Sequence, residues 1–206
     1  ELIALKPLEN RDESRLLKFQ DNQISESIFS NIIDYLNAGD VLVLNNTKVI
    51  PASLEGHCLG KKISINLIKK TSQSTEGKQV WDGLGKPGKR IIEGEFLNFT
   101  NDFCAKIIAK KPNGEFTLEF SESTKNFIEK LTKYGKMPIP PYISKKREAS
   151  QKDDENYQTI FADDDKSGSV AAPTAGLHFT ENLLNKIKNK GVKIAYVTLN
   201  VGAGTF

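Results

Sequence analysis

The order of apolar and polar residues predicts an α/β unit near the start of the chain. Within "SESIFSNIIDYLNAGD", apolar residues recur at helical spacing, which predicts a helix capped at Ser25 or Ser27 and ended by Gly39. The continuous apolar run at residues 41–44 then predicts a buried strand. The polar residues 45–48 follow at its carboxyl end, which is where ligands bind in many α/β folds.

Between residues 53 and 121 the pattern changes to short β-rich runs, several of them alternating apolar and polar positions. Turn formers such as "KPGK" and "PNG" separate these runs. Five or more short strands with no helix between them predict a small antiparallel β-barrel. The expected fold is an α/β sandwich domain built from residues 1–52 and 122–206, incomplete at its C-terminus, with an inserted β-barrel domain at residues 53–121.

The pattern after residue 121 predicts two more helices and a strand. The first helix covers residues 124–134 and ends at Gly135, and the second begins after the capping residue Thr180 and ends at Gly191. Between them, the prolines of "MPIPPYISKKR" predict an extended surface strap, and "KKREASQKDDEN" is expected to be mobile. The run "VKIAYVTLNV" is apolar on both faces and predicts a central strand.

Composition adds a few limits. Of the 206 residues, 38% are hydrophobic, enough to form a core without disulfides, and the net charge of +3 permits nucleic-acid binding without requiring it. Cys58 and Cys104 form no CxxC motif, so a reducing cytoplasm is expected, and His57 beside Cys58 has no second ligand pair, so no metal is expected. We see no apolar stretch long enough for a membrane span. Both ends look clipped, so we expect part of a longer protein.

The stretch "GSVAAPTAGLHFT", residues 168–180, contains no charged residue although the surrounding chain is rich in charge. One interpretation is a buried loop of small residues, in which a charge would be costly. The other is a binding loop, because Ser169, Thr174 and His178 add polar groups to it. A lone histidine is more often structural, but beside a helix N-terminus its neutral form is favoured and can act as a base.

Two further motifs permit both a structural and a functional interpretation. The glycines of "NVGAGTF" fit either a plain turn or a close backbone approach to a ligand. The "KPGKR" turn gathers three cations, which suits phosphate contacts better than the scattered lysine pairs do. Tyr142, Tyr157 and Trp81 could stack on bases, with core packing as the alternative, above all for Trp81.

Several stretches together resemble the S-adenosylmethionine:tRNA ribosyltransferase-isomerase family of queuosine biosynthesis. They are, in order, "ELIA" with "RDESRLL", "GDVLVLNNTKVIPASLEG", "KPGKR", "YGKMPIPPYI", "NYQTIFA", "GSVAAPTAGLHFT" and "VTLNVGAGTF". The resemblance implies an α/β domain with an inserted barrel, in agreement with the pattern above. It also implies a cytoplasmic, monomeric enzyme.

The resemblance implies that S-adenosylmethionine is the ribosyl donor and that no metal takes part. The acceptor would be a tRNA carrying a 7-aminomethyl-7-deazaguanine wobble base. The ribosyl unit would be transferred and isomerised to give epoxyqueuosine-tRNA, with release of adenine and methionine.

The matched motifs supply the candidate site residues. The predicted catalytic residues are His178, Thr174 and Ser169. Predicted substrate-binding residues are Asn46, Thr47, Tyr157, Gln158, Thr180, Gly202, Gly204 and Thr205, and predicted tRNA contacts are Lys48, Lys86, Lys89 and Arg90.

The chain departs from the family pattern at two positions. Asn46 stands where the family usually has Asp, and Asn200 where it usually has His. These replacements favour an alternative, a non-catalytic tRNA-binding paralogue, whereas the intact "GSVAAPTAGLHFT" favours the enzyme. A methyltransferase is a weaker third reading, because the usual glycine-rich donor motif is absent.

Overall fold

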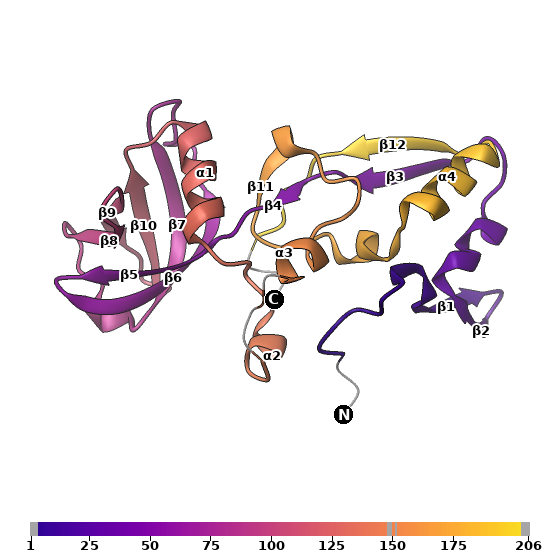
Figure 1. Cartoon of the computed structure of the whole chain (residues 1–206), viewed down its shortest axis with the longest axis horizontal. Helices are drawn as coiled ribbons and strands as arrows, with labels where there is room; N and C mark the ends of the chain where they lie inside the picture. The colour runs from indigo at the N-terminus through magenta and orange to yellow at the C-terminus, as the bar shows by residue number, and fades with distance from the viewer. Residues whose placement is uncertain (1–3, 148–149, 151, 203–206) are drawn as a thin grey trace.

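The computed structural model describes residues 4–147, 150 and 152–202. It has two parts, a closed barrel and an elongated region of short parallel sheets and helices (Figure 1). The predicted fold class, an α/β fold with a small antiparallel barrel, is confirmed. The exact domain boundaries stay a prediction.

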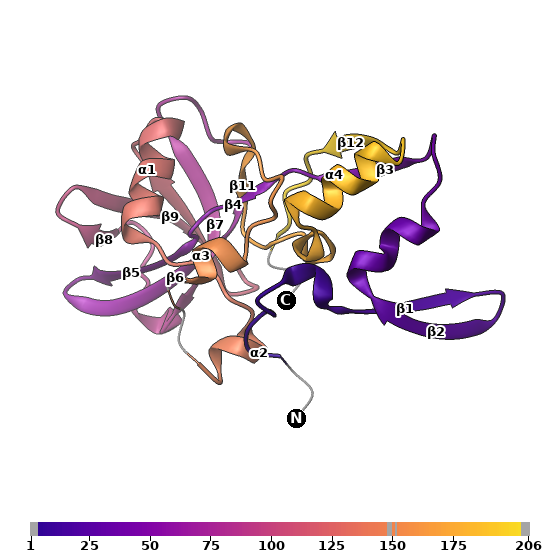
Figure 2. The same cartoon turned by 45° about the vertical axis from the view of Figure 1, so that its right-hand side comes forward.

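The barrel, on the left of Figure 2, contains six antiparallel strands. They close in the order β10-β7-β6-β5-β8-β9. Their bounds are β5 Ser53–Cys58, β6 Lys61–Lys70, β7 Gln79–Lys86, β8 Phe96–Thr100, β9 Phe103–Lys110 and β10 Glu115–Phe120. A short 3-10 helix, η3 at Gly88–Arg90, follows β7. Alternate residues of each strand point inward, so the period-two pattern of the sequence becomes a continuous apolar interior.

Helix α1, Thr124–Tyr134, packs against the barrel as its sequence predicts. Ser123 caps it by accepting a hydrogen bond from the Asn126 backbone N–H. The buried Phe127 ring stacks on Trp81 at 5.6 Å and meets Phe120 edge-on at 4.9 Å between ring centroids. The helix therefore belongs to the same aromatic core as the barrel strands.

The α/β region is formed by two small parallel sheets. Strand β3, Val41–Asn45, pairs with β12, Lys193–Val197, and β4, Lys48–Val49, pairs with β11, Ser167–Ser169. Helix α4, Glu181–Asn189, is capped by Thr180 as predicted and packs against the 3-10 helix η2, Phe29–Tyr35. Its inward residues join a second core cluster consisting of Phe29, Leu44, Phe179, Leu183, Leu184, Ile187 and Val192.

The prediction of fully buried strands was wrong for β3 and β12. Val41 and Val43 are 57% and 56% exposed, and Tyr196 is 48% exposed. Among the described residues β12 pairs with β3 alone. The side chain of Leu44 is buried in the cluster with α4, so this sheet has one covered and one open face.

The N-terminal helix starts later than its sequence suggests. Ser25 and Ser27 lie in β2, Gln23–Ile28, which forms a hairpin with β1, Arg15–Gln20. Asp21 and Asn22 connect the two strands with φ of 50° and 58°, the positive values that a tight two-residue hairpin turn needs. Only the residues from Phe29 onward are helical, and they form the 3-10 helix η2 rather than an α-helix.

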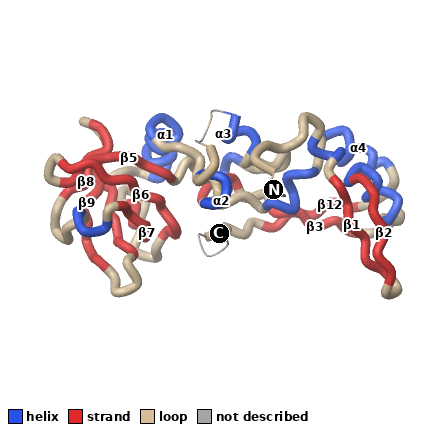
Figure 3. The backbone as a smooth tube through the Cα atoms, turned by 90° about the horizontal axis from the view of Figure 1, so that it is seen from below, coloured by secondary structure: helices blue, strands red, loops and turns tan. Residues whose placement is uncertain are grey.

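Short helices occur within the predicted strap and within the segment expected to be mobile, whereas residues 137–140 of the strap are not helical. Residues 148, 149 and 151 of the second segment lie outside the described residues, and its mobility stays a prediction. Helix α2 covers Pro141–Ser144 and α3 covers Lys152–Asn156, both between the barrel and the α/β region (Figure 3). A further 3-10 helix, η1 at Arg11–Glu13, lies near the N-terminus, and η4 covers Asp164–Lys166. None of the helices in the described part of the chain has the length and apolar character needed to cross a membrane.

The chain returns from the barrel beside its point of entry. Gly135 ends α1 at a close approach, because a Cβ there would lie 2.1 Å from the Pro51 carbonyl oxygen. Lys136 then exchanges two backbone hydrogen bonds with Ser53, of 2.8 and 3.1 Å. Entry and exit are therefore held together, and a side chain at residue 135 would push them apart.

Gly135→Ala should lower the free energy of unfolding by about 1–3 kcal/mol, because the added methyl meets backbone that cannot rotate away. Urea unfolding measures the change. Gly77→Ala is the matched control, since nothing lies within 4 Å of a Cβ at that position. Equal unfolding midpoints for the two variants would contradict the close approach.

Candidate functional site

The polar segment after β3 is tied to the segment after β12. The Asn45 side chain bonds the backbone of Leu199 twice, accepting from its N–H at 3.0 Å and donating to its carbonyl at 2.9 Å. Asn46 accepts a hydrogen bond from the Thr198 hydroxyl at 2.7 Å. The carboxyl ends of two parallel strands thus meet at one edge, as the sequence pattern predicts for a ligand site.

Thr47 is fully buried and donates its hydroxyl hydrogen bond to the Asn200 side chain at 2.7 Å. Asn46 and Asn200, the two departures from the family pattern, are therefore each hydrogen-bonded to a threonine hydroxyl, Asn46 to that of Thr198 and Asn200 to that of Thr47. Their amides act as acceptors here, and neither position contributes a carboxylate or an imidazole.

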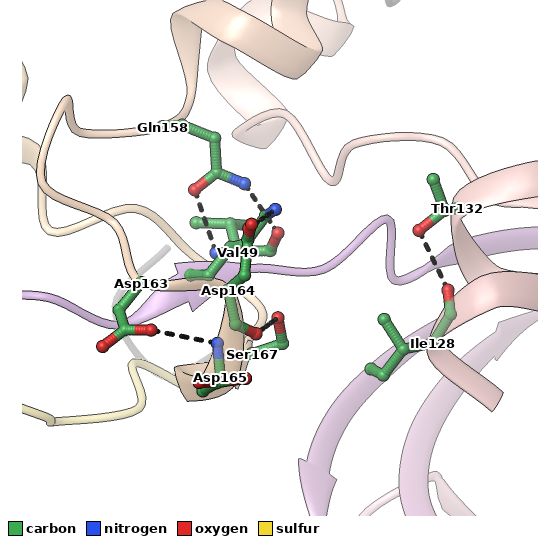
Figure 4. A network of polar contacts seen from close by, with 9 residues as sticks. Val49, Ile128, Thr132, Gln158, Asp163, Asp164, Asp165 and Ser167 are labelled. Carbon is green, nitrogen blue, oxygen red and sulfur yellow. Dashed lines mark hydrogen bonds and ion pairs between the residues drawn. The ribbon is translucent and has the colours of Figure 1, made fainter. Parts of the chain in front are cut away.

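The Gln158 side chain hydrogen-bonds the backbone of Val49, which lies further along this segment (Figure 4). Its side-chain amide donates to the Val49 carbonyl at 2.7 Å and its oxygen accepts from the Val49 N–H at 3.1 Å. The amide thus gives Val49 the two backbone hydrogen bonds that a neighbouring strand would otherwise supply. A substrate contact by Gln158 would have to share or displace these bonds.

The charge-free loop, residues 168–180, has features of both interpretations given above, a buried loop and a binding loop. Ser169 is buried, and its hydroxyl donates to the Ala171 carbonyl at 2.7 Å while accepting from the Val201 N–H at 2.9 Å. Ala171 and Ala172 are buried as well, whereas Thr174 and Ala175 are exposed. The loop is therefore packed at residues 169–172, exposed at residues 174 and 175, and buried again at Phe179.

His178 ends the 3-10 helix η5, Thr174–His178, and is half-buried. Its ring centre lies 5.1 Å from that of Phe29, in a tilted arrangement. Gly176, in the same helix, is close to Phe161, because a Cβ there would lie 2.8 Å from that ring. The imidazole is held by aromatic packing at the edge of the second core cluster.

Two neighbouring cavities open on either side of this helix. The first has a volume of about 700 Å³, and of the described residues that line it none carries a formal charge. Its walls combine the loop residues 171–176 with the aromatic rings of Phe29, Tyr142, Tyr157, Phe161 and Phe179. The second, of about 380 Å³, includes His178, Arg11, Arg147 and Asp153. Tyr142, Tyr157 and Thr174 line both.

Two groups around the second cavity have shifted pKa values. Burial raises the pKa of Tyr157 to about 12, so its hydroxyl stays protonated at neutral pH. The guanidinium of Arg147 holds the pKa of the Asp153 carboxyl below its usual value through two hydrogen bonds of 2.7 Å. Asp153 is 1% exposed, so this is a buried, bidentate ion pair.

The remaining predicted residues are spread more widely. The Thr180 hydroxyl accepts from the Leu183 N–H and donates to Asp12 at 2.8 Å, so both of its bonds serve the fold. Lys48 forms an ion pair with Asp164. Gly202 lies near the barrel residue Ile68, and Gly204 and Thr205 are outside the described residues. Lys86, Lys89 and Arg90 are exposed on the barrel and line neither cavity.

Sequence reasoning missed the charged residues that organise the second cavity. Arg11 donates to the backbone carbonyls of Gln158 and Glu155 at 2.8 and 2.7 Å, which anchors the N-terminal segment over this region. Arg147 also donates to the Leu5 carbonyl at 2.8 Å. Arg11 lies in the matched motif "RDESRLL", a signal that could have identified it, whereas "KKREASQKDDEN" looked merely polar. No group of three or more His, Cys, Asp or Glu suited to a metal ion occurs among the described residues.

A closed barrel beside short parallel sheets, with polar side chains at the carboxyl ends of the strands, defines the class of an α/β protein with a candidate ligand site at its sheet edge. Comparison with known proteins specifies it further. The family model described as "Queuosine biosynthesis protein" matches residues 1–206, and the chain belongs to this family.

Curated relatives support the assignment. The chain is 45% identical over 216 residues to the S-adenosylmethionine:tRNA ribosyltransferase-isomerase of Rickettsia bellii, covering 100% of the chain and 59% of that protein. It is 46% identical to the enzymes of that name from Clostridioides difficile, with coverage of 100% and 58%, and Finegoldia magna, with 99% and 56%. The chain thus spans less than two thirds of the length of the relatives it matches.

A crystal structure titled S-adenosylmethionine tRNA ribosyltransferase, from Thermotoga maritima, is 34% identical and matches with a TM-score of 0.35. The alignment covers 98% of this chain and 56% of that one.

Asp153→Asn should lower the free energy of unfolding by about 3 kcal/mol at pH 7, because it leaves the Arg147 cation without its counter-charge. The depressed pKa in the folded state means that this contribution is complete above the unfolded value of about 3.9 and is lost as pH falls through the lower folded value. Denaturant unfolding at pH 7 and at several acidic values measures it.

Asp165→Asn, at an exposed position, is the control for this ion pair, and it should change the free energy of unfolding little at any of these pH values. A stability difference between Asp153→Asn and the unaltered chain that stays constant down to pH 3 would contradict the assignment.

Proposed function

We propose that the protein of which this chain is the matched part is an S-adenosylmethionine-dependent tRNA ribosyltransferase-isomerase. The observation that carries the proposal is the first cavity, which is lined by the loop matching the family's "GSVAAPTAGLHFT" and by five aromatic rings, with no formal charge among the described lining residues. The names of the relatives support the same activity.

The first cavity suits the donor for two reasons. Its volume of about 700 Å³ falls within the range of sites for molecules the size of S-adenosylmethionine. The sulfonium is a cation, and aromatic faces such as those of Tyr142 and Tyr157 attract cations without supplying a carboxylate that could react. The same rings offer stacking surfaces for adenine.

His178 is the proposed general base or acid. Among the predicted catalytic residues it is the one with an imidazole, the side chain that most often serves as general base or acid in enzymes. It ends the same short helix whose first residue, Thr174, lines both cavities, so it lies next to the proposed donor site. A base there could remove the proton made acidic by the sulfonium, or an acid could protonate the departing adenine.

The proposed acceptor is the 7-aminomethyl-7-deazaguanine wobble base of a tRNA, and the product is epoxyqueuosine-tRNA with adenine and methionine released. Thr174 and Tyr157 are proposed to orient the substrates, because each presents a hydroxyl where the cavities meet. Lys48, Lys86, Lys89 and Arg90 are proposed phosphate contacts. A cytoplasmic, monomeric protein agrees with this reaction.

Asn46 and Asn200 favour the second candidate, a tRNA-binding paralogue without catalysis. Both amides are used in hydrogen bonds to threonine hydroxyls, and neither can transfer a proton as Asp or His would. Release of adenine from S-adenosylmethionine in the presence of acceptor tRNA separates the candidates. A methyltransferase would release the thioether product instead.

His178→Ala should lower the rate of adenine release by about 10²–10⁴-fold, the usual contribution of general acid–base catalysis. The assay uses S-adenosylmethionine and acceptor tRNA, with chromatographic detection of adenine. His57→Ala is the matched control, because His57 is the other histidine of the chain and is exposed on the barrel strand β5.

Binding of S-adenosylmethionine to the His178 variant should stay near that of the unaltered chain, which separates a catalytic role from lost folding. Turnover within threefold of the unaltered chain would remove His178 from the mechanism. Absence of adenine release by the unaltered full-length protein, with tRNA still bound, would favour the paralogue.

A further inference from the structure

A third hollow, the barrel–strap groove, lies between the barrel and the segment that leaves it. It has a volume of about 690 Å³ and is separate from the two cavities described above. Its barrel wall comes from β5, β6 and β7, and its other wall from residues 136–139 with Ser144 and Arg147. The paired backbone bonds between Ser53 and Lys136 close one side, so the groove is fixed by the fold.

Among the described charged residues of the groove, one cation has no ion pair. Glu55, the one carboxylate among the described residues that line the groove, is engaged by Lys62 at 3.0 Å and by Lys136 at 3.4 Å, which hold the pKa of the carboxyl below its usual value. Arg147 is occupied by Asp153. In the part of the chain that the structure describes, no ion pair involves Lys86. The groove therefore favours an anion at Lys86.

Uncharged polar groups lie beside this cation on the same wall. Ser64 is directly opposite Lys86 in the register of β6 and β7, and Asn66 is opposite Leu84. Residues two apart on a strand share a face, so Ser64 and Asn66 point to the same side as Leu84 and Lys86. Met137 and Ile139 add apolar surface from the opposite wall. This combination suits a phosphate joined to a sugar. The cation would meet the phosphate, the amide and the hydroxyl would meet the sugar hydroxyls, and the apolar wall would pack against the sugar ring.

The groove also leads toward the proposed donor site. Val170 lines the groove, and the next residue, Ala171, lines the first cavity. A strand of nucleic acid lying in the groove would thus continue toward the cavity in which a modified base would react. Lys89 and Arg90 belong to the same "KPGKR" turn but do not line the groove.

We propose that the barrel–strap groove binds the sugar-phosphate of an RNA nucleotide beside the reacting base, with Lys86 on the phosphate and Asn66 on the sugar. This inference rests on the proposed function, because it takes tRNA as the partner. It assigns the barrel a part in substrate binding and distinguishes Lys86 from the other cations of its turn.

The test measures binding of a labelled RNA anticodon stem-loop to the full-length protein that contains this chain, at several salt concentrations. Lys86→Ala should weaken binding about tenfold near 0.1 M salt and reduce the slope of log Kd against log salt by about 0.7–1, as for one lost phosphate contact. Asn66→Asp, which introduces a negative charge at nearly constant shape, should weaken binding at least as much.

Two further lysine variants are compared with Lys86→Ala. Lys106→Ala is the matched control, because it removes an exposed cation from β9, which is not among the strands that line the groove. Lys89→Ala removes another proposed phosphate contact, one that belongs to the same turn as Lys86 but does not line the groove. Both should weaken binding less than Lys86→Ala. The affinity for S-adenosylmethionine, measured by calorimetry, should be unchanged in all four variants, because none of the altered residues lines the first cavity.

The outcomes separate the two proposals. If the unaltered full-length protein binds the RNA and Lys86→Ala behaves like Lys106→Ala, the groove assignment is overturned and the proposed function stands. If the unaltered full-length protein fails to bind the RNA, the proposed function is overturned and the groove assignment with it.

Discussion

The structure depends on satisfying the backbone of the segment that carries the chain from the α/β region into the barrel. Buried N–H and carbonyl groups need partners, and a single chain crossing between two cores has no sheet of its own to supply them. The partners come from later parts of the chain: Val197 bonds the Asn46 N–H, the Gln158 side chain bonds Val49, and Ser169 bonds the Ile50 N–H. The crossing is therefore completed only when residues beyond the barrel have folded around it.

This constraint places the candidate site. The residues that satisfy the crossing segment belong to the same loops that form the cavity walls, so binding groups and structural groups are interleaved. Ser169 and Gln158 are used by the fold, whereas Thr174, Tyr157 and His178 lie at the cavities. The site lies where later loops supply hydrogen bonds to the crossing segment. Its chemistry comes from the few side chains of those loops that are not used in these bonds.

The sequence was sufficient for elements whose pattern depends on local contacts. The barrel strands, α1 and the Thr180 cap follow from alternation, helical spacing and capping chemistry within short windows. The exposure of β3 and β12 could not be predicted in this way, because apolar residues on both faces say nothing of what covers each face. The Arg147–Asp153 pair could not be predicted, because it lies in a stretch whose composition is that of a solvated loop. The tight turn at Asp21 and Asn22 was missed, because the helical spacing of the residues after it dominated the pattern.

The site was predictable to a similar extent. Motif matching placed Thr174 and His178 near one another, but it could not distinguish a hydroxyl used as a helix cap, as in Thr180, from one directed to a ligand. That difference depends on contacts with distant residues such as Asp12.

The chain contains one tryptophan, and its place gives the barrel an optical signal of its own. Trp81 is 1% exposed, stacked on Phe127, and its indole N–H has no hydrogen-bond partner in the described structure. An indole in such an apolar setting changes its emission when water reaches it, whereas the α/β region has no tryptophan to contribute. Fluorescence thus follows the barrel core alone, while circular dichroism follows the entire backbone. Coincident transitions would show that insert and host unfold together, and separate ones that the insert is a folding unit in its own right.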